Sequence, residues 1–106
     1  MTTKIIMLQE RLDAANAGSL RAEIKAAIDS GIRALILDCA LTEFIDSSGL
    51  AALVSGHKAM RIQKGQFILA RVNGGARDIF DLTRMDLVFT MFPTLAAAKA
   101  KAGEAV

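Results

Sequence analysis

The sequence contains one cysteine, one proline, one histidine and neither tryptophan nor tyrosine. Because Cys39 is the single cysteine, a disulfide within the chain and a metal site built from cysteines are both excluded, and we expect Cys39 to be a small core residue. No apolar run approaches the roughly 20 residues of a membrane-spanning helix, and no secretory leader precedes the first apolar segment. We therefore expect a cytoplasmic protein with no direct membrane insertion.

Positive charge is too dispersed to indicate a nucleic-acid partner, although the sequence pI is about 9.0. The formal net charge is only +2. Residues 1–53 carry five basic and seven acidic side chains, residues 54–106 carry eight and four, and neither half contains a basic run. The aromatic residues are five phenylalanines in mostly apolar surroundings, which does not suggest a surface for base stacking. We expect no nucleic acid among the partners.

The apolar residues fall into short segments that alternate between two patterns. With 106 residues, 53% of them hydrophobic, the chain can bury one core, which predicts a single domain over residues 1–106. Gly31 suits the end of the first helix and Pro93 the start of the last. The alternation predicts an α/β fold, with a mainly parallel four-stranded sheet and about four helices joined by right-handed crossovers. The expected strands are 5–8, 33–38, 67–72 and 88–92, and the expected helices are 14–30, 48–63, 76–83 and a last helix from 93 onward.

The stretch Phe-Ile-Asp-Ser-Ser-Gly-Leu at residues 44–50 leads from a buried-strand pattern into a helix start. Leu50 begins an apolar stripe at helical spacing, and Ser47 or Ser48 has the right chemistry to cap that helix. A helix start offers unpaired backbone N–H groups and partial positive charge, so a phosphate placed there would find hydrogen-bond donors. Ser47 and Ser48 are therefore candidate phosphoacceptors, with an ordinary helix cap as the alternative.

An enzyme mechanism is not indicated. A serine nucleophile needs a base within hydrogen-bond reach, and His57 is the only histidine. Ten residues of helix separate it from Ser47, which corresponds to roughly 15 Å. No phosphate-binding glycine motif or metal-ligand spacing is present. We expect a protein without catalytic activity or cofactor, in which His57 lies at the boundary of the core.

Three aspartates, Asp13, Asp38 and Asp46, could gather near one end of the sheet as an acid pair or a magnesium site. Each also occupies a position at which a carboxylate commonly has a structural role. Asp13 follows the first strand, Asp38 ends a strand and Asp46 precedes a helix. For Asp38 we predict the structural role.

Four segments together resemble the STAS domain and, within it, the anti-sigma factor antagonists. They are Arg-Leu-Asp-Ala-Ala-Asn-Ala at 11–17, the apolar strand at 34–38, the stretch at 44–50 and Asn-Gly-Gly-Ala-Arg-Asp-Ile-Phe at 73–80. The resemblance implies a partner switch. The unmodified antagonist binds an anti-sigma factor that is also a serine kinase, phosphorylation releases the antagonist, and a serine phosphatase of the PP2C type resets it.

The same resemblance implies the site residues. The family's modified residue is the first hydroxyl after the aspartate, which is Ser47 here, with Ser48 as second choice. A phosphoserine carries about −1.5 to −2 charges and would stand beside Asp46, so we expect a local electrostatic switch with little change of fold. The implied partner surface consists of Asp13, Asp46, Ser48, Gly49, Leu50, Asn73, Gly74 and Arg77.

The chain departs from the family pattern at its first strand and in two loops. Family members usually carry an additional strand before the one at 5–8, and residues 1–4 leave little to build it, so this edge strand is expected to be missing. An exposed sheet edge can pair with another chain, which suggests a homodimer. Gln9-Glu10 and Arg84-Met85 stand where the family often has glycine, which puts the shapes of these loops in doubt.

An alternative function comes from the same family. STAS domains also serve as subunits of lipid-transport and stress-sensing complexes, in which binding need not depend on phosphorylation. A stand-alone subunit of that kind would have a sequence much like this one.

Overall fold

The computed structural model describes residues 3–104. It confirms the predicted α/β fold, with four parallel strands in the main sheet and four α-helices. The strands are β1 (Thr3–Met7), β2 (Arg11–Leu12), β3 (Ala34–Asp38), β4 (Phe44–Ile45), β5 (Gln66–Ala70) and β6 (Thr90–Phe92). The helices are α1 (Ala17–Asp29), α2 (Ser47–Ile62), α3 (Gly74–Leu82) and α4 (Leu95–Glu104), with a 3₁₀ helix, η1, at Met85–Leu87.

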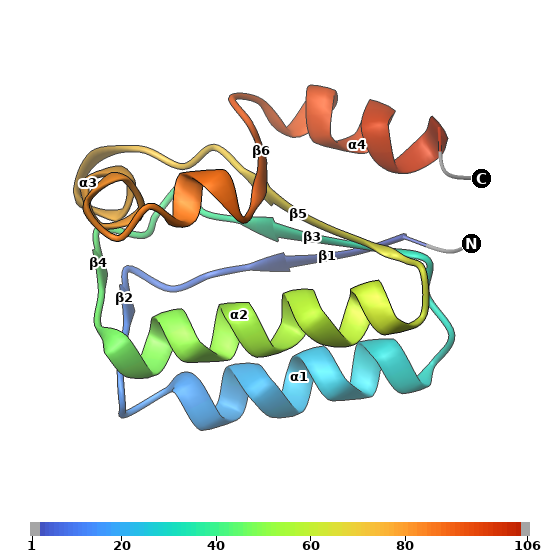
Figure 1. Ribbon diagram of the computed structural model, residues 1–106, viewed down its shortest axis with the longest axis horizontal. Helices are drawn as coiled ribbons and strands as arrows, with labels where there is room; N and C mark the ends of the chain where they lie inside the picture. The colour runs from blue at the N-terminus through green and yellow to red at the C-terminus, as the bar shows by residue number, and fades with distance from the viewer. Residues whose placement is uncertain (1–2, 105–106) are drawn as a thin grey trace.

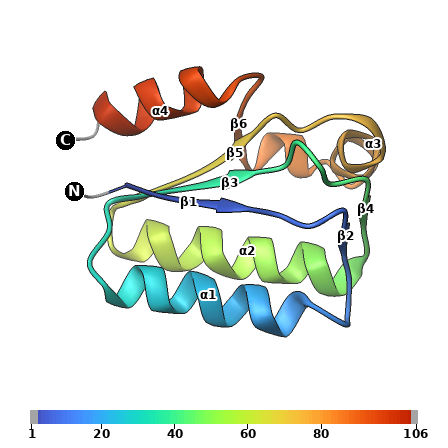
Figure 2. The same ribbon diagram turned by 180° about the vertical axis from the view of Figure 1, so that it is seen from behind.

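The main sheet has the order β1-β3-β5-β6, and every pair in it is parallel. Helices α1 and α2 lie side by side on one face of the sheet, while α4 covers the other (Figure 1, Figure 2). All five residues of β3 are buried, as expected of a strand that is covered on both faces. Within residues 3–104, none of the helices combines the length and apolar character needed to cross a membrane.

Side chains from alternate positions of the strands build two apolar clusters, one on each face of the sheet. The larger cluster lies under α1 and α2 and includes Leu35, Leu37, Leu53, Met60, Phe67 and Leu69. The smaller one lies under α4 and consists of Ala34, Ile36, Ile68, Ala70, Ala98 and Ala102. Cys39 is fully buried, as predicted, and burial raises the pKa of its thiol to about 12.

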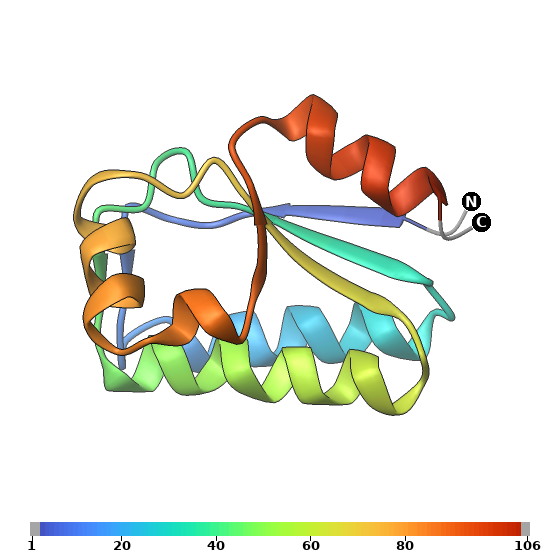
Figure 3. The ribbon, with the colours of Figure 1, turned by 45° about the horizontal axis from the view of Figure 1, so that its top comes forward.

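Two short strands that the sequence did not predict form a separate ribbon. Strand β2 pairs in parallel with β4, with Arg11 opposite Phe44 and Leu12 opposite Ile45. The Arg11 guanidinium lies 4.3 Å from the centre of the Phe44 ring, within the range of a cation–π contact. Figure 3 shows α3 at the same end of the molecule as this ribbon and the first turn of α2.

The helix boundaries differ slightly from the sequence-based expectation. The first helix begins at Ala17 because the preceding residues form a turn, in which the Asn16 N–H donates to the Asp13 carbonyl oxygen at 3.1 Å. Gly31 follows this helix with φ +87°, a left-handed conformation that suits glycine at a helix end. Arg84 adopts φ +60°, so the left-handed turn after α3 forms without a glycine.

Strand β1 lies at the edge of the main sheet, and among the described strands it pairs only with β3. We expected residues 1–4 to leave no room for an additional edge strand. Thr3 and Lys4 belong to β1. Residues 1 and 2 lie outside the described part of the chain. The side chains of Ile5 and Met7 are 38% and 55% exposed, which leaves apolar surface along this edge.

Candidate functional site

Helix α2 begins directly after Asp46, and this carboxylate, not a serine, caps it. Asp46 Oδ1 accepts a hydrogen bond from the Gly49 N–H at 3.0 Å, and its carbonyl oxygen accepts from the Leu50 N–H at 2.9 Å. The prediction that Ser47 or Ser48 is the cap was wrong, because the extended backbone of Asp46 lets its side chain reach the first turn. Neither serine hydroxyl therefore takes part in capping the helix.

The two serines differ in accessibility. Ser47 is the first residue of α2 and is exposed, whereas Ser48 is half-buried. Neither hydroxyl makes a hydrogen bond to another group in the part of the chain described here. Ser47 therefore presents its hydroxyl to solvent at a helix N-terminus, where an enzyme can reach it.

Gly49 allows the start of α2 to pack directly on the β2–β4 ribbon. A Cβ atom at this position would overlap the carbonyl oxygen of Leu12 and would lie 2.7 Å from its Cγ. The Asp46 N–H also donates to the Leu12 carbonyl oxygen, at 3.1 Å. The first turn of α2 is therefore held in place by the backbone of β2.

We expect Gly49→Ala to lower the free energy of unfolding by about 1–2 kcal/mol, because the added methyl group forces the helix start away from Leu12. Urea denaturation measures this change. Gly18→Ala is the matched control, since a Cβ there meets nothing within 4 Å, and it should leave stability unchanged or slightly raised. A Gly49→Ala protein as stable as the wild type would show that this packing is loose.

The start of α3 is fastened to the same region. Asn73 Nδ2 donates to the Arg71 carbonyl oxygen at 2.8 Å and to the Ala40 carbonyl oxygen at 3.4 Å. Gly74 follows with φ +51°, and the backbone of Gly75 lies so close to Glu43 that a Cβ would overlap the Glu43 carbonyl oxygen. Since Glu43 directly precedes β4, the start of α3 lies against the strand that leads into Ser47.

Asp13 lies in the turn before α1, beside the other strand of the ribbon. Its Oδ1 accepts from the Ala15 N–H at 3.0 Å, and its Oδ2 lies 3.4 Å from Arg11 Nε. The ribbon thus places Asp13 and Asp46 at the same end of the domain. Arg77, on the exposed side of α3, forms an ion pair with Asp81 at 3.2 Å.

Asp38 has a structural role, as predicted. The carboxylate is 1% exposed, accepts from Arg71 Nε at 3.0 Å and makes a second, short contact with Arg71 Nη2. This guanidinium lowers the pKa of Asp38 below its ordinary value. Among residues 3–104, no group of three or more His, Cys, Asp or Glu side chains is placed to hold a metal ion.

His57 is half-buried, in agreement with its predicted place at the edge of the core. Its ring packs edge-on against Phe67 and Phe89, with centroid distances of 5.9 and 5.6 Å. Burial lowers the pKa of His57, and the charge of Arg61 lowers it further. Because His57 and Ser47 both belong to α2, ten residues apart, they cannot act as base and nucleophile on one substrate.

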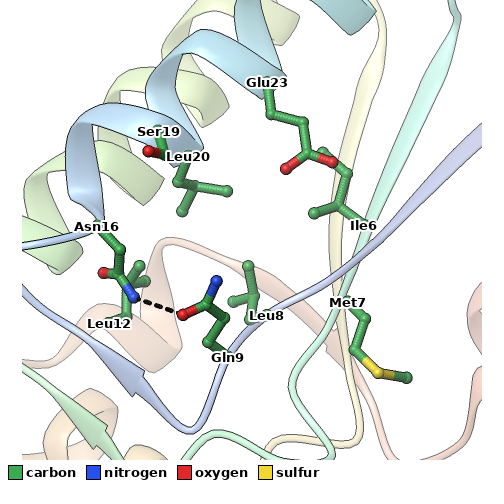
Figure 4. Close-up of a pocket in the computed structure, with 9 residues that line it drawn as sticks. All are labelled: Ile6, Met7, Leu8, Gln9, Leu12, Asn16, Ser19, Leu20 and Glu23. Atoms are coloured by element: carbon green, nitrogen blue, oxygen red, sulfur yellow. Dashed lines mark hydrogen bonds between the residues drawn. The ribbon is translucent and has the colours of Figure 1, made fainter.

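A small pocket lies between the end of β1 and α1 (Figure 4). Asn16 Nδ2 donates to Gln9 Oε1 at 3.1 Å across its mouth, and the same nitrogen donates to the Arg11 carbonyl oxygen at 2.6 Å. The first of these bonds gives Gln9 a structural role in this loop. The pocket volume is about 60 Å³, far below the roughly 300 Å³ at which sites for small molecules begin.

Comparison with known proteins gives a family and several relatives. The family model described as STAS domain matches residues 2–98. The candidate anti-sigma factor antagonist BtrV of Bordetella bronchiseptica is 30% identical over 91% of this chain and 83% of its own.

Solved structures share the fold. An anti-sigma factor antagonist from Mycobacterium paratuberculosis superimposes with a TM-score of 0.84 at 25% identity, over 94% of this chain and 85% of that one. A sulfate transporter family protein from Wolinella succinogenes also reaches a TM-score of 0.84, over 95% of this chain and 84% of that one. At 16% identity, the second likeness concerns the fold alone.

Proposed function

Because this chain belongs to the STAS domain family, we propose that it is an anti-sigma factor antagonist that changes partners when Ser47 is phosphorylated. In the proposed cycle, the unmodified protein binds an anti-sigma factor serine kinase in the cytoplasm. Phosphorylation releases it, and a serine phosphatase of the PP2C type restores it. The proposed protein is a binding partner and not an enzyme. The observation that carries the proposal is the exposed hydroxyl of Ser47 at the start of α2, left free because Asp46 caps the helix.

The chemistry of the helix start supports Ser47 as the phosphoacceptor. The Gly49 and Leu50 N–H groups are already bonded to Asp46, so the N–H groups of Ser47 and Ser48 remain for a phosphate. Half-burial makes Ser48 the second choice. The adjacent carboxylate of Asp46 adds to the negative charge that a bound partner would have to cover.

We propose that the partner covers the end of the domain where the β2–β4 ribbon meets the starts of α2 and α3. Asp13 and Asp46 flank the ribbon, and the exposed Asn73 and Gly74 begin α3. Gly49 is buried, so its contribution is to let α2 approach β2. The proposed contact residues are Asp13, Asp46, Ser48, Leu50, Asn73, Gly74 and Arg77.

Co-purification from the native cells tests the proposed function. Tagged wild-type protein and the Ser47→Ala variant are isolated under the same conditions, and the retained proteins are identified by mass spectrometry. We expect both to retain a serine kinase of the anti-sigma type, with more retained by Ser47→Ala because it cannot be released by phosphorylation. Equal retention of permease and ATPase subunits, without a kinase, would contradict the proposal.

That contrary outcome would support the second candidate, a non-switching subunit of a lipid-transport or stress-sensing complex. The Wolinella succinogenes sulfate transporter family protein shows that the same fold also occurs in a transporter family. Genes next to this one provide an independent check. Kinase and phosphatase genes favour the switch, while permease and ATPase genes favour the subunit.

We also propose that the protein pairs with a second copy through the free edge of β1. The exposed side chains of Ile5 and Met7 lie on this strand, and at its outer edge no other strand of residues 3–104 pairs with it. Sedimentation equilibrium should show a dimer at high concentration, and the double variant Ile5→Lys, Met7→Lys should shift the equilibrium to monomer. A strictly monomeric wild-type mass at millimolar concentration would overturn this assignment.

A further inference from the structure

A shallow groove of about 440 Å³, largely open to solvent, lies on α2 between Ser47 and Lys58. Its apolar lining comes from Leu50, Ala51 and Val54 of α2 and from Met85 of η1 on the opposite wall. Leu50, Val54 and Met85 pack partly against the core, so each has apolar surface left over for the groove. None of the sequence patterns predicted η1, and the groove was therefore missed.

The segment that forms the Met85 wall carries further exposed apolar surface. Leu82 is 83% exposed, Leu87 is 71% exposed and Val88 is 41% exposed. This segment is η1 with the residues on either side of it, and its Met85 lines the groove together with residues of α2. The exposed apolar residues near Met85 in the chain add apolar surface at this end of the domain.

The two ends of the groove differ in charge, with Asp46 beside Ser47 at one end and cations near the other. Helix α2 contains no acidic residue, and its second half carries Lys58, which lines the groove, and Arg61, which borders the adjoining hollow with Ile62. In the region that the structure describes, neither cation forms an ion pair with a carboxylate. Asp86, on η1, has one carboxylate oxygen buried. An occupant of the groove therefore meets an apolar middle and a basic far end.

We propose that this groove is the docking site for an acidic amphipathic helix of the anti-sigma factor kinase; this inference rests on the proposed function. From Ser47 to Lys58 the groove follows eleven steps of α2, or roughly 16 Å, which matches a partner helix of about three turns. Apolar side chains on one face of that helix would contact Leu50, Val54 and Met85. Acidic side chains on its flank would pair with Lys58 and Arg61.

This arrangement gives phosphorylation a direct effect on docking. Ser47 lies at one end of the groove and the cations near the other, so a phosphate on Ser47 would add negative charge beside Asp46, at the end that the partner helix has to cover. Removal of water from this charge would then oppose docking without any movement of α2 or η1. In this proposal, the groove is the surface on which the switch acts.

Affinity for the kinase that phosphorylates Ser47, purified by that activity, tests the proposal. Ala51→Glu and Lys58→Glu place negative charge in the groove on an exposed helix face, and Ala96→Glu and Lys99→Glu make the same changes on α4. We expect each groove variant to weaken binding at least tenfold and the effect of Lys58→Glu to shrink in high salt, while the α4 variants bind like wild type. Thermal melts establish that all four variants are folded. Equal affinities, with Ser47 still phosphorylated, would overturn the groove and leave the proposed function standing.

If no kinase acts on Ser47, the proposed function fails, and the groove is tested separately with two helical 15-residue peptides. Both peptides have the same apolar face, and their polar positions are glutamate in one and lysine in the other. We expect the glutamate peptide alone to shift the amide resonances of Leu50, Val54, Lys58 and Met85 in NMR spectra. Shifts from both peptides, shifts elsewhere or no shifts would contradict the inference.

Discussion

Phosphorylation of Ser47 is expected to weaken the affinity for the anti-sigma factor kinase about a hundredfold. Docking the modified protein means removing water from a group of about −1.5 to −2 charges that stands beside Asp46. A cost of about 3 kcal/mol for this desolvation corresponds to that loss of affinity. Calorimetric titration of the kinase with unmodified protein and with protein phosphorylated at Ser47 measures the difference.

The same phosphoprotein should keep its fold, because the remaining N–H groups of the first turn of α2 can receive the phosphate. Amide chemical shifts are expected to change near Ser47 and to stay constant in β3 and β5. Ser48→Ala is the control for the loss of affinity. Phosphorylation of this variant at Ser47 should weaken its affinity for the kinase by the same factor as in the wild type. A rearrangement of the sheet or of α1 on phosphorylation would contradict the local electrostatic mechanism.

Arg71→Ala is expected to lower the free energy of unfolding by about 2–3 kcal/mol at neutral pH. The substitution leaves the carboxylate of Asp38, which is 1% exposed, without its cation. Since the Arg71 side chain is 40% exposed, water can partly replace it, and the loss should lie at or below the lower end of the range for fully buried pairs. Chemical denaturation measures the loss, and Arg21→Ala, an exposed arginine on α1, is the control.

Acid should reduce the effect of Arg71→Ala. Because Arg71 lowers the pKa of Asp38 in the folded protein, the contribution of the pair is complete above the ordinary aspartate pKa and is lost as pH falls through the folded pKa. The stability difference from wild type should therefore shrink below about pH 4. Arg71 also has φ +60°, so Arg71→Gly separates backbone strain from the ion pair. A stability loss that is absent in Arg71→Gly, or that does not change with pH, would contradict the role of the pair.

Sequence patterns predicted the main sheet because its central strand is buried on both faces. The run at 34–38 is apolar up to Asp38, and all five residues are buried in β3. The helix that follows Asp46 was predicted for the same kind of reason, since an apolar stripe at helical spacing requires a covered face. These features depend on residues that are neighbours in the sequence, so a sequence pattern can reveal them.

The rest of the site depends on contacts between distant segments. Strands β2 and β4 are two residues each, too short for a period to be read, and they exist because they pair with one another. Arg71 lies 33 residues from Asp38, and nothing in the local sequence relates them. The cap was assigned to a serine because the sequence alone does not show that the backbone of Asp46 is extended. Gly49 carried a usable signal, since glycine in the first turn of a helix is a common mark of close packing.

Mapping phosphate on the protein isolated from its native cells tests the central claim most directly. Intact mass and peptide fragmentation are compared between the wild type and Ser47→Ala across growth conditions. We expect one phosphate on Ser47 that is absent from the variant. Phosphate on Ser48, or none under any condition, would contradict the assignment of Ser47 as the residue that switches partners.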